Sequence, residues 1–221
     1  MRRRLAFGLL ALLCGVAGAF AQGNSHRRGG TPGDFDFYVL ALSWSPSFCQ
    51  SEAGQRSRRQ CDIEARDEFV VHGLWPQYTR GFPSHCDASQ RFVPRAALNK
   101  AADIFPDERL ARYQWDKHGS CSGLSPSQYF DDVASARAKV VVPSDFHRPA
   151  RPLEVSPAEI ERAFAGANRG LRSDMMSVSC KRGQLTEIRV CLSKDLRDFV
   201  PCTEVDRSSC RSREIAVPVG R

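Results

Sequence analysis

The chain has 221 residues, of which 42% are hydrophobic and 26% charged, and its formal net charge at pH 7 is +7. It contains no internal repeat, and beyond residue 21 no apolar run approaches the roughly 18 residues that a membrane-spanning helix needs. The composition therefore excludes a repeat protein and an integral membrane protein, and the modest basic excess suits a polyanionic partner without establishing one.

Residues 1–21 are predicted to be a secretory signal peptide. They carry three arginines, an apolar run from Leu5 to Val16, and a small-residue stretch that ends in Ala-Phe-Ala. A cleaved leader has this order of charged, apolar and small residues, so we expect cleavage after Ala21 and a secreted or periplasmic protein. Lipid attachment at Cys14 is a weaker alternative. Without the three leader arginines, the net charge of +7 falls to +4.

The first part of the mature chain has the pattern of β-strands. Residues 35–43 are rich in aromatic and β-branched side chains and are predicted to form a buried strand. Residues 69–72 predict a second strand, which Gly73 and Pro76 are expected to stop. Residues 49–61 contain a glycine and three arginines and are expected to form a loop.

From residue 94 onward the spacing of apolar residues becomes helical. Residues 125–136 and 156–167 each predict a helix that begins with Ser-Pro, and the second has a capping box. Residues 110–118 are expected to form another helix. Towards the C-terminus the period returns to two, with a turn at residues 181–183.

Strands, then helices, then strands predict an α+β fold, with helices packed on a central antiparallel β-sheet. We expect residues 22–34, which are rich in glycine, serine and arginine, to be a flexible lead-in. Residues 35–221 are expected to form a single domain.

The cysteines predict a protein that folds in an oxidising compartment. The chain has nine, and Cys14 in the leader leaves eight for the mature protein. An even number behind a signal peptide indicates four disulfides. A zinc site is the weaker alternative, because the chain contains no C-x-x-C. Eight cysteines allow 105 pairings, so their spacing leaves the connectivity open.

Two histidines from distant parts of the chain lie in similar surroundings. His72 belongs to the segment VHGLWP at residues 71–76, and His118 belongs to WDKHGSC at residues 115–121. A single histidine at a strand end is usually structural. Two of them, each followed by glycine and close to tryptophan, favour a shared site.

The residues around His118 suit chemistry on a phosphate. If residues 110–118 are helical, Gln114 shares a face with His118 and Lys117 flanks both. Two imidazoles can act as acid and base in mildly acidic water, and an ammonium group can stabilise charge that develops on phosphate oxygens. This is the equipment for cleavage of RNA by its own 2′-hydroxyl, which needs no metal or other cofactor. DNA lacks that hydroxyl and is expected to survive.

The two segments resemble the active-site segments of the ribonuclease T2 family of acid endoribonucleases. The matching residues are HGLWP at 72–76 and KHGxC at 117–121, and the strand FYVLALSWSP at 37–46 resembles that family's first strand. The resemblance extends in outline to Cys210. It implies an α+β fold and cleavage of single-stranded RNA through a 2′,3′-cyclic phosphate with little base specificity. It also implies the disulfide pairs Cys49–Cys61, Cys86–Cys121, Cys180–Cys210 and Cys191–Cys202.

The second segment departs from the family pattern at two positions. The family usually has His-Glu where this chain has Tyr113 and Gln114. Tyr113 can still donate a hydrogen bond to substrate, but Gln114 can carry neither a proton nor a negative charge. We therefore expect catalysis by His72, Gln114, Lys117 and His118 with a weaker dependence on acid pH. The alternative is an RNA-binding protein that has lost turnover.

The roles of the remaining aromatic and histidine residues follow from their positions. Trp75 is expected either to stack on a base of the substrate or to fill the core, whereas Trp44 and Trp115 are expected in the core. His26, His85 and His147 are predicted to face solvent without a role. We expect a monomer whose partner is single-stranded RNA.

Two other classes of protein remain as alternatives. One is a secreted, cysteine-rich binding module, such as an inhibitor, in which both histidines are structural. The other is a metal-dependent nuclease, but the sequence lacks the acidic cluster that such a site needs. Cleavage that persists in a chelator and requires both histidines distinguishes the metal-independent enzyme from each of them.

Overall fold

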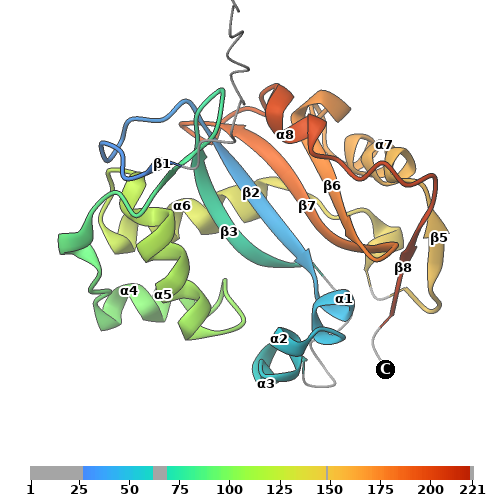
Figure 1. The fold of residues 1–221 in the computed structure, drawn as a ribbon, viewed down its shortest axis with the longest axis horizontal. Helices are drawn as coiled ribbons and strands as arrows, with labels where there is room; N and C mark the ends of the chain where they lie inside the picture. The colour runs from blue at the N-terminus through green and yellow to red at the C-terminus, as the bar shows by residue number, and fades with distance from the viewer. Residues whose placement is uncertain (1–26, 62–68, 148, 220–221) are drawn as a thin grey trace, which may run out of the picture.

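The protein is built around a six-stranded sheet with the strand order β3-β2-β7-β8-β5, in which β6 also pairs with β7 (Figure 1). The computed structural model describes residues 27–61, 69–147 and 149–219, so the predicted signal peptide lies outside the described residues. The strands of the sheet are β2 (Phe37–Trp44), β3 (Phe69–Gln77), β5 (Leu153–Val155), β6 (Met176–Lys181), β7 (Gln184–Ser193) and β8 (Ile215–Val217).

The sheet is mixed rather than purely antiparallel. All of its strand pairs are antiparallel except β7 with β8, which meet in parallel at Gln184 and Ala216. The predicted α+β fold is confirmed, and the predicted antiparallel order is wrong only at this junction. The turn between β6 and β7 falls where it was predicted, because Arg182 and Gly183 both take positive φ, as a two-residue hairpin turn requires.

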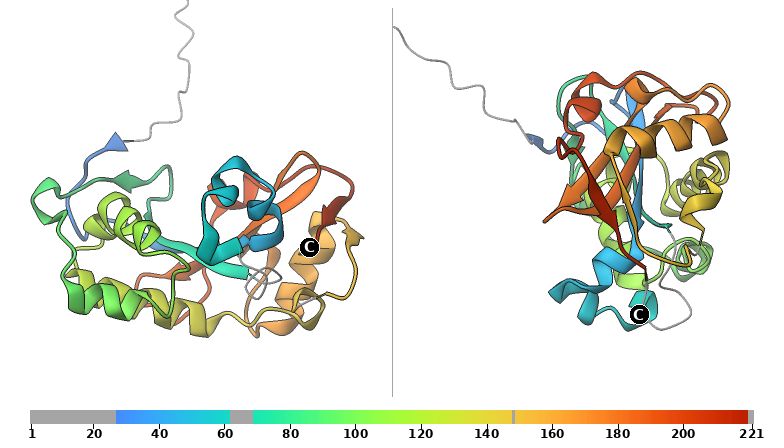
Figure 2. Two further views of the ribbon diagram at one scale, coloured as in Figure 1. Left: turned by 90° about the horizontal axis from the view of Figure 1, so that it is seen from below. Right: turned by 90° about the vertical axis from the view of Figure 1, so that its right-hand side faces the viewer.

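Helices lie mainly on one face of the sheet, and α6 and α7 are seen there in the right-hand view of Figure 2. Serine caps both of these helices, and the capping box predicted at Ser156 is confirmed. Ser125 forms a second capping box with Gln128, which was not predicted. The helices are α1 (Ser45–Cys49), α2 (Glu52–Gln55), α3 (Arg58–Cys61), α4 (Arg95–Ala101), α5 (Glu108–Lys117), α6 (Pro126–Lys139), α7 (Pro157–Ala167) and α8 (Thr203–Arg207). Single 3₁₀ turns occur at residues 88–90, 119–121, 144–146 and 173–175.

The alternation of side chains along β2 divides the interior in two. Leu40, Leu42 and Trp44 point into the main core beneath the helices, whereas Val39 points to the opposite face. There it packs in a smaller cluster with Cys191, Cys202 and Val205, and Trp75 lies against that cluster. Both faces of β2 are therefore covered, which explains why this strand is apolar almost throughout.

Strand β3 is longer than the sequence predicts. It passes through Gly73 and Pro76 and ends at Gln77. The proline is tolerated because β3 is the edge strand and pairs only with β2. Proline has no backbone N–H to donate, but no strand lies on the other side of β3 to need that hydrogen bond. The prediction that Gly73 and Pro76 stop the strand is therefore wrong.

The predicted loop at residues 49–61 is wrong as well, because this region holds the end of α1 and the short helices α2 and α3. A disulfide between Cys49 and Cys61 closes it. The other disulfides also follow the pairing that the resemblance implies, and they are Cys86–Cys121, Cys180–Cys210 and Cys191–Cys202. Such links typically contribute about 2–4 kcal/mol each to stability.

The described part of the predicted lead-in, residues 27–34, lies against the domain. Strand β1 (Arg27–Arg28) pairs in parallel with β4 (Pro83–Ser84), and the Gly33 N–H donates to the carbonyl of Cys121 at 2.9 Å. None of the helices in the described part of the chain is long and apolar enough to cross a membrane.

The packing of α7 on the sheet predicts a large loss of stability in Phe164→Ala. The Phe164 side chain is 0% exposed, and its ring lies 5.7 Å from that of Phe69 and 6.0 Å from that of Phe146. Its removal leaves a cavity, so we expect the free energy of unfolding in urea to fall by about 3–5 kcal/mol. Phe92→Ala is the matched control, because Phe92 is 78% exposed and its loss should cost less than about 0.5 kcal/mol. Equal losses in the two variants would contradict the assigned packing.

Candidate active site

His72 occupies a β-bulge in the edge strand β3. Ala41 of β2 pairs with Gly73 and Leu42 pairs with Val71, so His72 is the extra residue and has no partner on β2. A bulge changes the direction in which a side chain points, and bulges are common beside active sites. The His72 side chain is 39% exposed, and its Nδ1 lies 2.6 Å from Oε2 of Glu187.

The contact between His72 and Glu187 crosses the whole width of β2. β3 and β7 flank that strand, so they lie roughly 10 Å apart. The residue of β2 that pairs with Glu187 is Ser43, and the next one on the same face is Ala41. Their side chains are small, which leaves room for the imidazole and the carboxylate to meet above them.

Glu187 is buried and ionised. Its Oε1 accepts a hydrogen bond from Nε of Arg189 at 2.7 Å, while its Oε2 faces His72. Burial acts to raise the pKa of this carboxyl group, but the hydrogen bonds and charges of His72 and Arg189 outweigh burial and hold the pKa below its usual range. Glu187 was not among the predicted site residues. The available signal was an acidic residue at an alternating position of a strand, two residues before Arg189 on the same face.

Helix α5 supplies the second half of the site. Asp107 caps its N-terminus, the helix ends at Lys117, and the N–H of His118 still donates to the carbonyl of Gln114 at 2.9 Å. The predicted helix is confirmed, with His118 as the residue that ends it. The Gln114 side chain is 1% exposed, and its Oε1 accepts a hydrogen bond from Nε1 of Trp75 at 2.8 Å.

His118 differs from His72 in its surroundings. It is 3% exposed, and its Nδ1 has no hydrogen-bond partner among the residues that the structure describes. Burial lowers the pKa of the His118 imidazole well below its usual value near 6.5, and the charges of Lys117, His72 and His85 lower it further. His118 is therefore a neutral imidazole in mildly acidic water.

The indole of Trp75 brings the two histidines together. Its ring is stacked with that of His118 at 5.2 Å and meets the ring of His72 edge-on at 5.3 Å. The guanidinium carbon of Arg189 lies 5.3 Å from the centre of the same indole. Trp75 is only partly buried, so it is neither a core residue alone nor a free stacking platform.

Gly73 explains why the first segment needs a glycine after its histidine. A Cβ atom at this position would collide with the Gln114 amide and with Nε1 of Trp75. The absence of a side chain therefore allows the hydrogen bond between Trp75 and Gln114 that joins β3 to α5.

Lys117 and Tyr113 lie at the outer side of the same helix. The Lys117 ammonium nitrogen is 5.6 Å from the centre of the Tyr113 ring, and Tyr113 is exposed. Lys117 is close enough to His118 for its charge to act on that imidazole, whereas Tyr113 is placed only by its contact with Lys117. Of the predicted site residues, the structure thus gathers His72, Trp75, Gln114, Lys117 and His118 between β3 and α5.

The structure corrects the prediction for His85. Its Nδ1 lies 3.0 Å from Oδ2 of Asp116, and its backbone N–H donates to the carbonyl of Lys117 at 2.9 Å. His85 is thus a partly buried neighbour of the site rather than a free surface residue, because the Cys86–Cys121 disulfide holds its loop against the end of α5.

The remaining aromatic and histidine predictions have mixed outcomes. Trp44 and Trp115 are fully buried, as predicted. His147 is exposed, as predicted. His26 lies outside the described residues.

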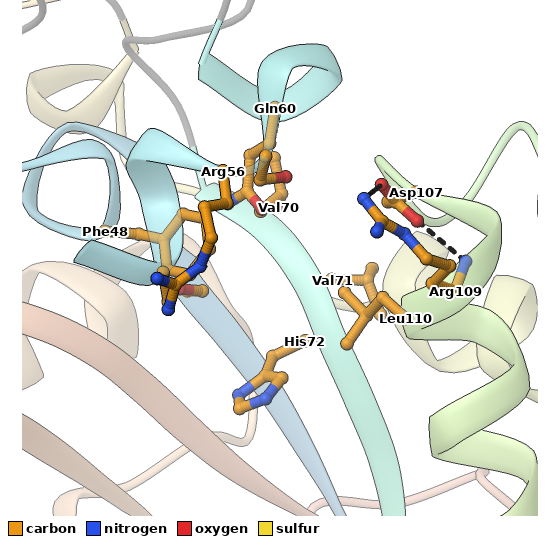
Figure 3. Close-up of a pocket in the computed structure, with 12 residues that line it drawn as sticks. Phe48, Arg56, Gln60, Val70, Val71, His72, Asp107, Arg109 and Leu110 are labelled. Carbon is orange, nitrogen blue, oxygen red and sulfur yellow. Dashed lines mark hydrogen bonds and ion pairs between the residues drawn. The ribbon is translucent and has the colours of Figure 1, made fainter. Parts of the chain in front are cut away.

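A cavity of about 370 Å³ opens beside His72 (Figure 3). Its walls come from β2, β3, the region of α1–α3 and the start of α5. Apolar side chains such as Phe48, Val70 and Leu110 line it, Arg56 adds positive charge, and Arg109 is paired with Asp107 at 3.5 Å. A volume of this size is within the range of pockets that hold small molecules.

No group of three or more His, Cys, Asp or Glu side chains is arranged to hold a metal ion in the part of the chain that the structure describes.

Known proteins resemble this chain in both sequence and fold. Residues 35–202 match the sequence model of the Ribonuclease T2 family. A ribonuclease of Aeromonas hydrophila is 34% identical over 177 residues, which cover 79% of this chain and 80% of that protein. Ribonuclease I of Escherichia coli is 26% identical over 211 residues, which cover 74% and 77% of the two chains.

Solved structures with the same fold have lower sequence identity. An RNase-related protein from Calystegia sepium has a TM-score of 0.65 at 20% identity, with 85% of this chain and 98% of the other covered. RNase NT, solved in complex with 5′-AMP, has a TM-score of 0.59 at 21% identity, with 84% and 99% covered. The family match spans both histidine segments and most of the sheet, so the chain belongs to the ribonuclease T2 family of endoribonucleases.

Proposed function

We propose that this protein cleaves single-stranded RNA by transesterification, with His118 as the base and His72 as the acid, and without a metal ion. One observation carries the proposal: two imidazoles in opposite electrostatic environments flank the same indole. Burial keeps His118 neutral, whereas His72 faces the buried carboxylate of Glu187. A buried histidine and a solvent-accessible histidine that contacts a carboxylate are suited to separate base and acid roles.

The reaction follows from these two roles. Neutral His118 removes the proton of the 2′-hydroxyl, and the oxygen attacks the neighbouring phosphorus. The bond from phosphorus to the 5′-oxygen breaks as protonated His72 gives its proton to that oxygen. The products are a 2′,3′-cyclic phosphate and a free 5′-hydroxyl, and DNA has no group that can start the sequence.

The neighbours of His118 complete the proposed site. The Lys117 ammonium stabilises the charge that grows on the non-bridging phosphate oxygens. Gln114 accepts from Trp75 through its oxygen, which leaves its amide N–H groups for a phosphate oxygen. Tyr113 and Trp75 are proposed to contact the RNA, Tyr113 through its exposed ring and hydroxyl.

The cavity beside His72 is proposed to hold a base of the substrate. Because His72 protonates the departing oxygen, this base belongs to the nucleotide on the leaving side of the cut. The walls formed by Phe48, Val70 and Leu110 suit stacking and apolar contact more than a specific pattern of hydrogen bonds. Low base specificity is consistent with such a lining.

We also propose that the enzyme works outside the cytoplasm, after removal of residues 1–21. Disulfides persist in secreted and periplasmic proteins, and the described residues contain four of them. The proposed site is formed by residues of one chain, which supports action as a monomer.

The two histidines are predicted to be essential for rapid cleavage. His72→Ala and His118→Ala should each reduce cleavage of a fluorescent single-stranded RNA by about 10²–10⁴-fold, the usual contribution of a general acid or base. Cleavage by the wild type should persist in a chelator and produce a 2′,3′-cyclic phosphate terminus, detectable by mass spectrometry.

His147→Ala is the matched control, since His147 is exposed and distant in sequence from both segments. It should cleave at the wild-type rate. Loss of wild-type cleavage in the chelator would contradict the metal-free mechanism, and a wild type that binds RNA without cutting it would contradict the proposed function.

Gln114 is predicted to weaken the dependence of cleavage on acid pH. Because the pKa of His118 is lowered well below 6.5, the base stays available in acid, and kcat/KM of the wild type should fall only well below pH 6.5. A buried carboxylate in Gln114→Glu would favour protonated His118 and raise its pKa. The acidic limb of the pH profile should therefore move to higher pH in the variant. Identical profiles for the two proteins would show that Gln114 does not set this dependence.

A further inference from the structure

We propose that Glu187 is a positioning residue that orients the His72 imidazole and leaves its Nε2 as the nitrogen that delivers the proton. The inference rests on the proposed function, because it assigns how the acid of that reaction is held. A base or acid that is oriented by a third group is a recurrent arrangement in enzyme sites.

The geometry of Glu187 is that of a fixed acceptor. Its Oε2 lies 2.6 Å from Nδ1 of His72, and its Oε1 accepts from Nε of Arg189 at 2.7 Å. Each carboxylate oxygen therefore has its own partner, so the carboxylate cannot rotate without breaking a contact. Burial of the side chain removes water as a competing partner.

His72 requires such a partner because its backbone does little to hold the ring. It is the bulged residue of an edge strand and has no opposite residue on β2. Its side chain is 39% exposed, and a neutral imidazole can carry its proton on either nitrogen. A carboxylate at Nδ1 selects the form in which Nδ1 bears the proton and Nε2 is free.

The charges around His72 make Glu187 the natural counter-ion. Arg189 faces the same region from β7, and Lys117 and His118 face it from α5. Arg56 lines the same cavity as His72. Asp107 also lines that cavity, but it caps α5 and lies beside Arg109, so Glu187 is the anion in contact with His72. Gln114 stands where the family usually has a glutamate. In this chain the carboxylate beside the histidines thus comes from β7 rather than from α5.

The proposed contact keeps the proton balance simple. In the cleavage step, the Nε2–H bond of His72 breaks and a bond from that hydrogen to the 5′-oxygen forms. Nδ1 keeps its proton, which stays in the hydrogen bond to Glu187. Before the next turnover, protonated His118 releases to water the proton that it took from the 2′-hydroxyl, and Nε2 of His72 takes up one proton from water. The exchange has no net gain or loss of protons, and Glu187 remains ionised throughout.

The test is Glu187→Gln in the full chain, because an amide can accept from Nδ1–H but can also donate to a bare Nδ1. We expect kcat on single-stranded RNA to fall by about 10²–10⁴-fold, with a much smaller change in KM. Nitrogen NMR of neutral His72 should show the Nδ1–H form in the wild type and a shift towards the Nε2–H form in the variant.

Glu154→Gln is the matched control, because Glu154 lies exposed on β5. This substitution removes the same charge at a position away from the site. It should preserve both kcat and the His72 tautomer. Thermal unfolding of each variant checks that the fold is retained, and the tautomer of wild-type His72 decides the matter even if Glu187→Gln does not fold.

Two results would overturn the inference: the Nε2–H form of neutral His72 in the wild type, or an unchanged kcat and tautomer in Glu187→Gln. Failure of the proposed function gives a different result. In that case the wild type does not cleave RNA, although the Nδ1–H form of His72 is still present and still depends on Glu187.

Discussion

The two halves of the site depend on contacts with a single side chain, the indole of Trp75. One half comes from the edge strand β3 and carries His72, and the other comes from the end of α5 and carries His118. The indole touches both imidazoles and donates its N–H to Gln114. Gly73 makes this possible, because any side chain there would occupy the space of the Trp75–Gln114 hydrogen bond.

This contact gives two chemically identical side chains different properties. The packing of His118 against the indole and the surrounding helix removes it from water, and the resulting desolvation lowers its pKa. His72 keeps access to solvent and has a buried carboxylate at Nδ1. One fold thereby places a buried imidazole and a solvent-accessible imidazole beside the same indole, which suits the separate base and acid roles proposed for them.

The small residues of β2 leave the space in which two further groups of the site meet. Ser43 and Ala41 form a low surface between β3 and β7, and across it His72 meets Glu187. Large side chains at these positions would separate the two groups. The alternation of β2 thus provides bulky residues for the main core on one face and space for the site on the other.

The sequence by itself determined the elements and the identity of the central residues. Local patterns act over three or four residues, so the helix at 126–139 and the turn at 182–183 could be predicted. The family resemblance implied the disulfide pairs and pointed to His72 and His118. The local signals were wrong at Pro76, because they do not tell an edge strand from a central one.

Only the tertiary structure decided which residues support the two histidines. Glu187 lies 115 residues from His72 in the chain, and their contact depends on the order of the strands, the bulge in β3 and the small residues of β2. The pairing of His85 with Asp116 likewise depends on a disulfide that closes its loop. Desolvation of His118 also arises only when β3 and α5 come together, because burial is a property of the assembled fold and not of a local sequence pattern.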